Sequence, residues 1–133
     1  MESPIILSFL LADKVFREME TGKVHIAGTF NQLSAFSYPM VHPQFFSYIA
    51  VTALKAGKHQ LGMELSYFES GEKLLKVDQE IKSGGPLEVI EMNMCFNQIM
   101  FKNHGNVELV LKLNNEIMQT RKLILKKIEK KPI

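Results

Sequence analysis

The fold class is indicated by one segment, residues 58–81, which reads KHQLGMELSYFESGEKLLKVDQEI. Over residues 58–68 apolar and polar side chains alternate, so that every second side chain can face a core while the others face solvent. The same alternation resumes over residues 73–81. The connection between them, residues 69–72, is short and contains a glycine, as hairpin loops do. This segment therefore predicts two antiparallel strands joined by a tight turn.

A second hairpin is predicted near the C-terminus. Residues 107–113 and 116–126 flank the pair Asn114-Asn115, and the first of these segments alternates cleanly between apolar and polar residues. Asparagine tolerates the positive φ that both central residues of a two-residue primed turn adopt. The pair is therefore the expected point of chain reversal.

Four further segments have the composition of strands, namely residues 5–12, 23–33, 44–55 and 87–95. With the two hairpins they make about eight strands at roughly 10–12-residue spacing, which is typical of all-β sandwiches and barrels. We therefore predict an antiparallel β-sandwich of seven to nine strands.

Three local features add detail to the predicted strand pattern. Residues 5–12 and 44–55 carry apolar side chains on both faces, as expected of central strands or of strands covered by a neighbour. Gly28 has no side chain to pack in mid-strand, so it marks a bulge or a close backbone approach. The spacing of apolar residues over residues 13–20 also allows a short helix.

The core is predicted from the apolar faces of these strands. Its expected members are Leu7, Phe9, Leu11, Val24, Ile26, Phe30, Ile49, Val51, Leu61, Met63, Leu65, Leu75, Val77, Ile90, Met92, Leu109 and Leu111.

Length and composition fit one globular domain. The chain has 133 residues, of which 46% are hydrophobic and 23% charged, and this balance argues against a disordered chain. We expect one domain over residues 1–128, followed by a short basic tail at 129–133. The lone Cys95 excludes an intramolecular disulfide and a multi-cysteine zinc site, and we expect it to be a small buried apolar residue.

A cytoplasmic location is predicted. No apolar run reaches the roughly 20 residues of a membrane-spanning helix. The N-terminal residues 1–12 include an apolar stretch but lack the basic start of a secretory signal, and Asp13 and Lys14 follow where a small-residue cleavage site belongs.

No catalytic residue, cofactor or metal site is expected. The four histidines, His25, His42, His59 and His104, are dispersed, and no glycine-flanked nucleophilic serine occurs. With two aspartates in all, the chain also lacks the oxygen ligands that calcium requires. One alternative stays open: a small hydrolase in which His25 or His59 lies beside Asp13 or Asp78.

The segment 38–43 is a candidate binding loop. It contains Tyr38-Pro39 and His42-Pro43, and proline holds the preceding residue in an extended conformation. The segment is therefore rigid, which fits either a structural crossover between strands or a loop that binds a partner.

Basic residues gather at the C-terminal end. Of the 16 basic and 14 acidic residues in the chain, six basic and one acidic lie in residues 121–133, so the preceding 120 residues hold ten basic and thirteen acidic. This segment can contact a polyanion, either nucleic acid or an anionic membrane, or can serve as a solvated chain end. The candidate contacts are Lys126, Lys127, Lys130 and Lys131.

Short motifs in the N-terminal third resemble those of a family of short bacterial single-domain proteins that is known only as a domain of unknown function. The motifs are Leu11-Ala12-Asp13-Lys14, Thr21-Gly22-Lys23, Ile26-Ala27-Gly28-Thr29-Phe30, Pro39 and His42-Pro43. The resemblance extends to a C-terminal hairpin like residues 105–122 and implies an immunoglobulin-like β-sandwich. It implies no activity, substrate or catalytic residue.

The expected function is protein association rather than catalysis. Sandwiches leave edge strands whose free amides and carbonyls can pair with another chain, and we expect such edges at the terminal hairpin or at residues 73–81. Eight methionines add adaptable apolar surface. A protein partner or a second copy is therefore favoured over nucleic acid or a membrane.

Overall fold

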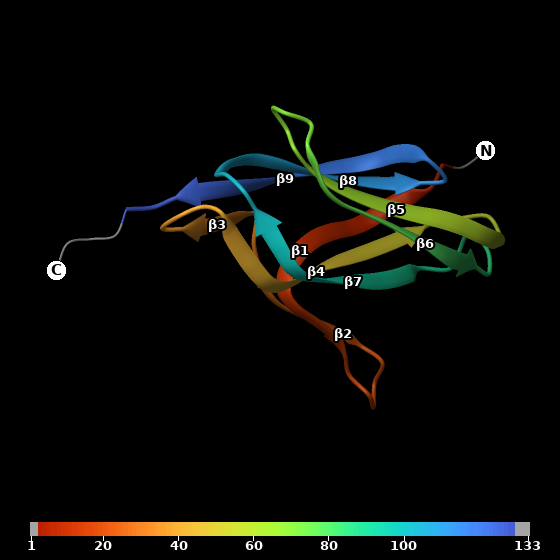
Figure 1. Cartoon of the computed structure of the whole chain (residues 1–133). Coiled ribbons are helices and arrows are strands. Elements are labelled where there is room, and N and C mark those ends of the chain that lie inside the picture. The colour runs from red at the N-terminus through yellow and green to blue at the C-terminus, as the bar shows by residue number, and fades with distance from the viewer. Residues whose placement is uncertain (1–2, 130–133) are drawn as a thin grey trace.

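The computed structural model of this chain describes residues 3–129. These residues form strands and no helix (Figure 1). The strands are β1 (Ile5–Arg17), β2 (Val24–Thr29), β3 (Gln32–Ala35), β4 (Met40–Thr52), β5 (Gly57–Tyr67), β6 (Lys73–Ser83), β7 (Ile90–Phe101), β8 (Gly105–Leu113) and β9 (Glu116–Lys127). The predicted all-β class and the predicted number of strands are confirmed. Over the described range, no helix of the length and apolarity needed to cross a membrane is present.

The strands form two sheets. The four-stranded sheet has the order β2-β1-β4-β7, and the five-stranded sheet has the order β3-β9-β8-β5-β6. Neighbours are antiparallel except β3 and β9, which are parallel, so the prediction of a wholly antiparallel arrangement is wrong at this pair. The cause is a crossing between sheets. The amide of Phe30 donates to Leu11 in one sheet, whereas the carbonyl of the next residue, Asn31, accepts from Ile124 in the other.

Both sheets contribute to one core. Phe45 and Ile49 of β4 face the same buried cluster as Leu61 and Met63 of β5 and Leu109 of β8. Most of the predicted core residues lie in this cluster or pack against it. With no disulfide in the chain, burial of these side chains is the main stabilising contribution.

Two predicted core residues are instead exposed, and Val24 lies outside the cluster. Leu7 is 54% exposed because the register between β1 and β4 shifts between Ile6 and Ser8. Ile26 is 38% exposed because β2 pairs with β1 beyond the edge of the two-sheet body.

The short helix that the spacing over residues 13–20 allows is not formed. β1 continues to Arg17, and residues 12–17 pair with β2, as in Arg17 with Val24. Ladder hydrogen bonds from a neighbouring strand thus override a weak helical spacing. The predicted strand over 23–33 is likewise divided into β2 and β3, which belong to different sheets.

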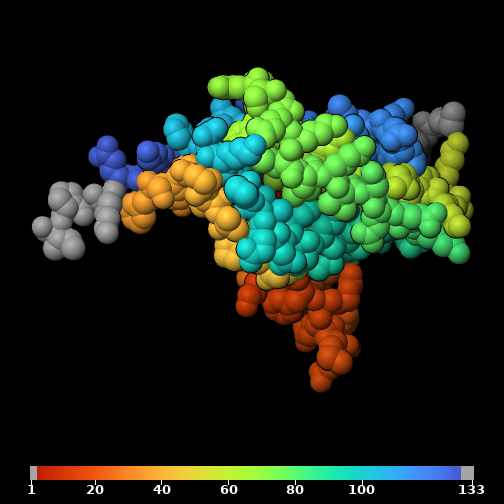
Figure 2. Space-filling model, viewed as in Figure 1, coloured from red at the N-terminus to blue at the C-terminus, as the bar shows by residue number. Residues whose placement is uncertain are grey.

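The hairpin of β1 and β2 projects from the body and is called the arm, residues 13–29 (Figures 1 and 2). At its base, Gly28 has a φ of 72°, and a Cβ built there would lie 2.5 Å from Oδ2 of Asp13. The predicted close approach at Gly28 is therefore confirmed. The register continues unshifted on both sides of it, so no bulge is present.

Both predicted hairpins are confirmed. β5 pairs with β6, and β8 pairs with β9 through a turn in which Asn114 and Asn115 have φ values of 51° and 70°. The strand predicted to begin at residue 87 begins at Ile90 and extends to Phe101.

Candidate interaction surface

The outer face of the five-stranded sheet is charged. At its centre the carboxylate of Glu64, whose side chain is 13% exposed, lies 3.4 Å from the Nζ of Lys112, 3.5 Å from that of Lys73 and 3.9 Å from that of Lys76. Partial burial acts to raise the pKa of Glu64, but hydrogen bonds and charge from Lys112 and Lys73 outweigh it and hold the pKa below its ordinary value. This face has the composition of a solvated surface.

The outer face of the four-stranded sheet is mostly apolar. Its side chains form rows across β1, β4 and β7, because residues in register share a face. The rows are Ser8, Ala50 and Glu91; Leu10, Tyr48 and Asn93; and Ala12, Phe46 and Cys95. We call these nine residues the outer patch.

Glu91, the charged residue of the outer patch, is paired with groups of its own chain. Tyr48 donates a short hydrogen bond to Glu91, and Arg17 of the arm lies 3.9 Å from the same carboxylate. Burial, followed by the hydrogen bond and charge of Glu91, raises the pKa of Tyr48 to about 12. Tyr48 therefore stays protonated and remains a donor at neutral pH.

The arm is held against this face. Asn93 donates from Nδ2 to the carbonyl of Val15 at 3.4 Å, next to the ion pair of Arg17 with Glu91. Phe16 on the arm stacks on the ring of His25 and is still 51% exposed. The arm thus adds exposed apolar surface beside the outer patch.

Cys95 was expected to be buried, and this prediction is wrong. Met94 and Phe96 point into the core, so the side chain between them points outward and is exposed. Its Sγ accepts from Gln44 at 3.4 Å and lies 3.8 Å from Oδ1 of Asn97. The error arose because residue 95 was placed at the end of a strand that continues to Phe101.

Of the candidate binding loop, residues 38–43, the structure places Tyr38 and Pro39 before β4 and residues 40–43 within β4, which pairs with β7. Tyr38 donates from its hydroxyl to the carbonyl of Lys126 at 2.8 Å and packs edge-on against His104, and the bond before Pro39 is cis. The ring of His42 lies within 5.7 Å of that of Phe45. These contacts attach the segment to β9 and to the core, while Pro43 lies within β4. They fit the structural alternative for this segment, and a binding role stays a prediction.

The candidate polyanion contacts are divided. Lys126 and Lys127 end β9, where they pair with Ser34 and Ala35 of β3. Lys130 and Lys131 lie outside the described residues.

The two histidines of the hydrolase alternative are held by other partners. His25 bonds Glu18 at 2.8 Å on the arm, and this hydrogen bond lowers the pKa of Glu18. His59, on the other sheet, uses both ring nitrogens: Nε2 donates to the carbonyl of Lys55, and Nδ1 accepts from Asn114. Between residues 3 and 129 no hydrogen bond joins either histidine to Asp13 or Asp78, and no group of three potential metal ligands occurs there.

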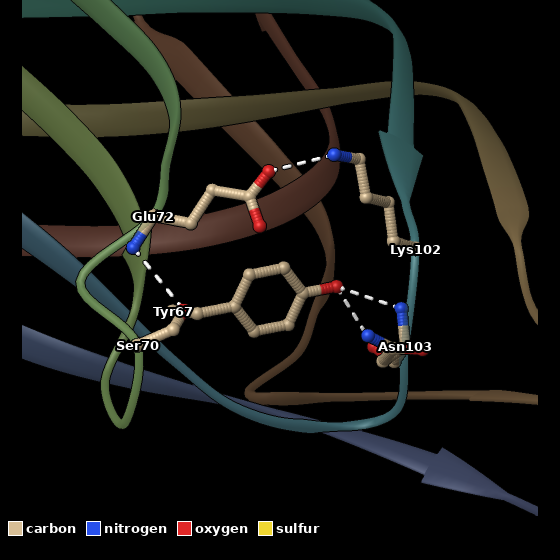
Figure 3. Close-up of polar contacts among 5 residues, drawn as sticks. All are labelled: Tyr67, Ser70, Glu72, Lys102 and Asn103. Carbon is tan, nitrogen blue, oxygen red and sulfur yellow. Dashed lines mark hydrogen bonds and ion pairs between the residues drawn. The ribbon is translucent and has the colours of Figure 1, made fainter.

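A further polar cluster lies where the β5–β6 loop meets the end of β7 (Figure 3). The hydroxyl of Tyr67 donates to the carbonyl of Asn103 at 2.8 Å and accepts from its amide at 3.1 Å. Lys102 pairs with Glu72 at 2.8 Å, and this bond raises the pKa of Lys102. Since these groups satisfy one another, the cluster joins two loops and has the properties of a structural contact.

Sequence reasoning missed the outer patch, although a signal for it was present. The apolar residues on both faces of residues 5–12 and 44–55 were explained by central or covered strands. β1 and β4 are indeed central, and the arm contacts part of their outer face, where Val15 and Arg17 meet Asn93 and Glu91. A two-sided apolar strand can therefore indicate a face that is partly covered within the chain and partly open to a partner.

Comparison with known proteins gives a family without an assigned activity. Residues 7–126 match the model described as a family of unknown function, DUF6941. No curated protein matches the chain. The predicted resemblance to a family of unknown function is thereby confirmed.

Proposed function

We propose that this chain, which belongs to the family of unknown function DUF6941, is a non-enzymatic protein-association module that self-associates through its four-stranded sheet. The observation that carries the proposal is the contrast between the two outer faces. One presents Glu64 among lysines, whereas the other carries the half-buried side chains of Leu10, Phe46 and Tyr48 beside two buried alanines. Partly exposed apolar and aromatic side chains on a sheet face with little charge are typical of protein contacts.

A second copy is the partner that these charges favour. In a two-fold contact the same residues of both copies come together, so a surface with unpaired charge repels its own copy. The charged residue of the outer patch, Glu91, is already paired with Arg17 and Tyr48 of its own chain. The lysine-rich face of the five-stranded sheet carries several like charges and is therefore poorly suited to a self-contact.

The fold proposed for the module is an immunoglobulin-like sandwich. In that fold the first, second and fifth strands share one sheet, and the third, sixth and seventh share the other. β1, β4 and β7 correspond to the former set, and β5, β8 and β9 to the latter, with β6 as the added edge strand. On this assignment the arm is an insertion after the first strand.

The test is the mass of the full chain in solution, measured by light scattering over a series of concentrations. We expect the mass to rise from one copy to two with concentration, and to do so similarly at low and high salt. Cys95→Lys, on the four-stranded sheet, should shift this transition to higher concentration. Gln79→Lys adds the same charge on exposed β6 of the other sheet and should leave it unchanged.

Two results would overturn the proposal. One is a chain that stays monomeric at high micromolar concentration. The other is an association that disappears in high salt and in a variant with Lys126, Lys127, Lys130 and Lys131 changed to glutamine. The second result would favour polyanion binding, because contacts with polyanions weaken steeply with salt.

A further inference from the structure

We infer that two copies join by antiparallel pairing of β7 with the β7 of the second copy, which makes one continuous sheet of eight strands from two of four. This inference rests on the proposed self-association and places the contact at the free edge of the four-stranded sheet, where the outer patches of the two copies lie side by side on one sheet and do not face each other. It starts from the backbone of the edge strands rather than from their side chains.

The two sheets end in four strands, β2, β7, β3 and β6, and three of them carry features that discourage pairing. The part of β1 before Ala12 also lacks a strand on one side, but there the side chain of Arg121 already bonds the carbonyl of Phe9. β2 has six residues and β3 has four, which makes both short. β6 has eleven residues, of which five are charged. Short length and charged side chains are the usual protection of an edge against unwanted pairing.

β7 lacks this protection. It has twelve residues, and Glu91 is its one charged residue. Within residues 3–129 the backbone of β7 is paired with β4 on one side and with no strand on the other. Its free side therefore presents a row of amides and carbonyls over residues 90–97, up to Gln98, whose φ of 54° interrupts the extended conformation.

The sequence of β7 is compatible with itself in the antiparallel direction. A two-fold axis perpendicular to the sheet pairs residues whose numbers have a constant sum and keeps their side chains on the same face. With the axis at Met94, Met92 lies opposite Phe96, and Glu91 lies opposite Asn97. No like charges then face each other, and the apolar side chains extend the core side of one sheet into the next.

The same pairing would be unfavourable at β6. Lys73, Lys76 and Lys82 lie on this edge together with two acidic residues, and a register that places Lys76 opposite Lys82 also places Asp78 opposite Glu80. Like charges directly opposite each other destabilise a strand pair. β6 is thus the internal control for β7.

The experiment is amide hydrogen exchange by NMR on the full chain, at one concentration where light scattering gives a monomer and at one where it gives a dimer. Hydrogen bonds in an antiparallel ladder point alternately to either side, so every second amide of β7 faces away from β4. We expect these alternate amides within residues 90–97 to exchange more slowly in proportion to the dimer fraction. The free-edge amides of β6 should keep their rate.

The outcomes separate this inference from the proposed function. A dimer whose β7 amides exchange as fast as those of the monomer would overturn the edge pairing and leave self-association standing. A dimer in which β6 gains the protection would also overturn it. A chain that stays monomeric would overturn both. In Cys95→Lys, the alternate β7 amides should lose the slower exchange that the dimer gives them. In Gln79→Lys, these amides should keep it.

Discussion

Gly28 shows how one residue shapes the arm. It adopts a φ of 72° where β2 leaves the body, and the Asp13 side chain occupies the space that a Cβ would need. A non-glycine residue in this backbone region costs about 1–2 kcal/mol from φ alone. Where a neighbouring atom also occupies the position of the new Cβ, a steric cost adds to the cost in φ.

We predict that Gly28→Ala lowers the free energy of unfolding by more than Gly71→Ala does. Gly71 has nearly the same φ, 73°, but a Cβ there would meet nothing within 4 Å. The strain in φ is thus common to both variants, about 1–2 kcal/mol, and the contact with Asp13 adds to Gly28→Ala alone. Urea unfolding of both variants measures the difference. Equal losses would mean that Asp13 moves aside without cost.

Glu64 makes stability depend on pH. Although burial acts to raise the pKa of Glu64, lysines hold that pKa in the folded protein below its ordinary value, so the ionised form stabilises the fold. This contribution is fully present above the unfolded value of about 4.3 and is lost as the pH falls through the folded pKa.

We therefore predict that Glu64→Gln is less stable than the natural chain at neutral pH and that this difference shrinks as the pH is lowered from 5 into the acid range. Unfolding free energies of both proteins at a series of pH values provide the measurement. Glu80→Gln, at a more exposed carboxylate on β6 for which Lys58 lies 3.9 Å away, is the matched control. A difference that does not change with pH would contradict the assigned role of the lysines.

At the scale of elements, the β8–β9 turn is one that the local sequence alone was sufficient to predict. Both asparagines have positive φ, but their side chains differ in the hydrogen bonds that they make. Asn114 accepts from the amide of Gln60 through Oδ1 and donates to His59, whereas no side-chain hydrogen bond of Asn115 is found in the described part of the chain. A substitution of Asn115 therefore tests the backbone conformation of the turn without removing a side-chain hydrogen bond.

For this turn we predict that Asn115→Gly is neutral or stabilising by a few tenths of a kcal/mol, since glycine suits this position of a primed turn. Asn115→Ala should destabilise by about 1 kcal/mol, because alanine lacks the short polar side chain that makes asparagine tolerant of the left-handed region. Thermal and urea unfolding distinguish the two. An alanine variant as stable as the glycine variant would mean that the turn changes type.

The elements that could be predicted from the sequence are those with a local cause. Alternation marked β5 and β6, and the asparagine pair marked the reversal between β8 and β9. The end of β1 and the division of β2 from β3 depend instead on pairing with distant strands, as when Asn31 accepts from Ile124. The outward position of Cys95 likewise required the full length of β7. The outer patch could not be predicted, because the sequence does not show whether a strand face is covered by another part of the protein.

At the scale of the whole molecule, stability depends on which apolar residues the two sheets enclose. Leu65 and Leu7 were both predicted to be core residues, but Leu65 is fully buried and Leu7 is 54% exposed. We predict that Leu65→Ala lowers the unfolding free energy by about 2–5 kcal/mol, as truncation of a buried leucine does. Leu7→Ala should stay within about 0.5 kcal/mol of the natural chain. Similar losses for the two would contradict the register shift that turns Leu7 outward.

Closure of the two sheets along one side involves a single arginine. β2 pairs with β1 only from Ala12 onward, so the carbonyl of Phe9 lies on a side of β1 without a strand partner. Arg121 of β9, in the other sheet, donates from Nη1 to this carbonyl at 2.8 Å. The bond thus joins the two layers where no backbone ladder does.

We predict that Arg121→Met destabilises the protein by about 1–3 kcal/mol, because methionine keeps most of the aliphatic stem but leaves the buried Phe9 carbonyl without its donor. Lys122→Met removes the same charge from the next residue of β9, where the side chain is exposed, and should change stability by less than about 0.5 kcal/mol. Urea unfolding of both variants measures the two losses, and hydrogen exchange near Phe9 locates the first. If both variants lose the same amount, net charge rather than the link between sheets is responsible. If Arg121→Met loses more and the amides around Phe9 exchange faster, the arginine acts as the connection between the two sheets.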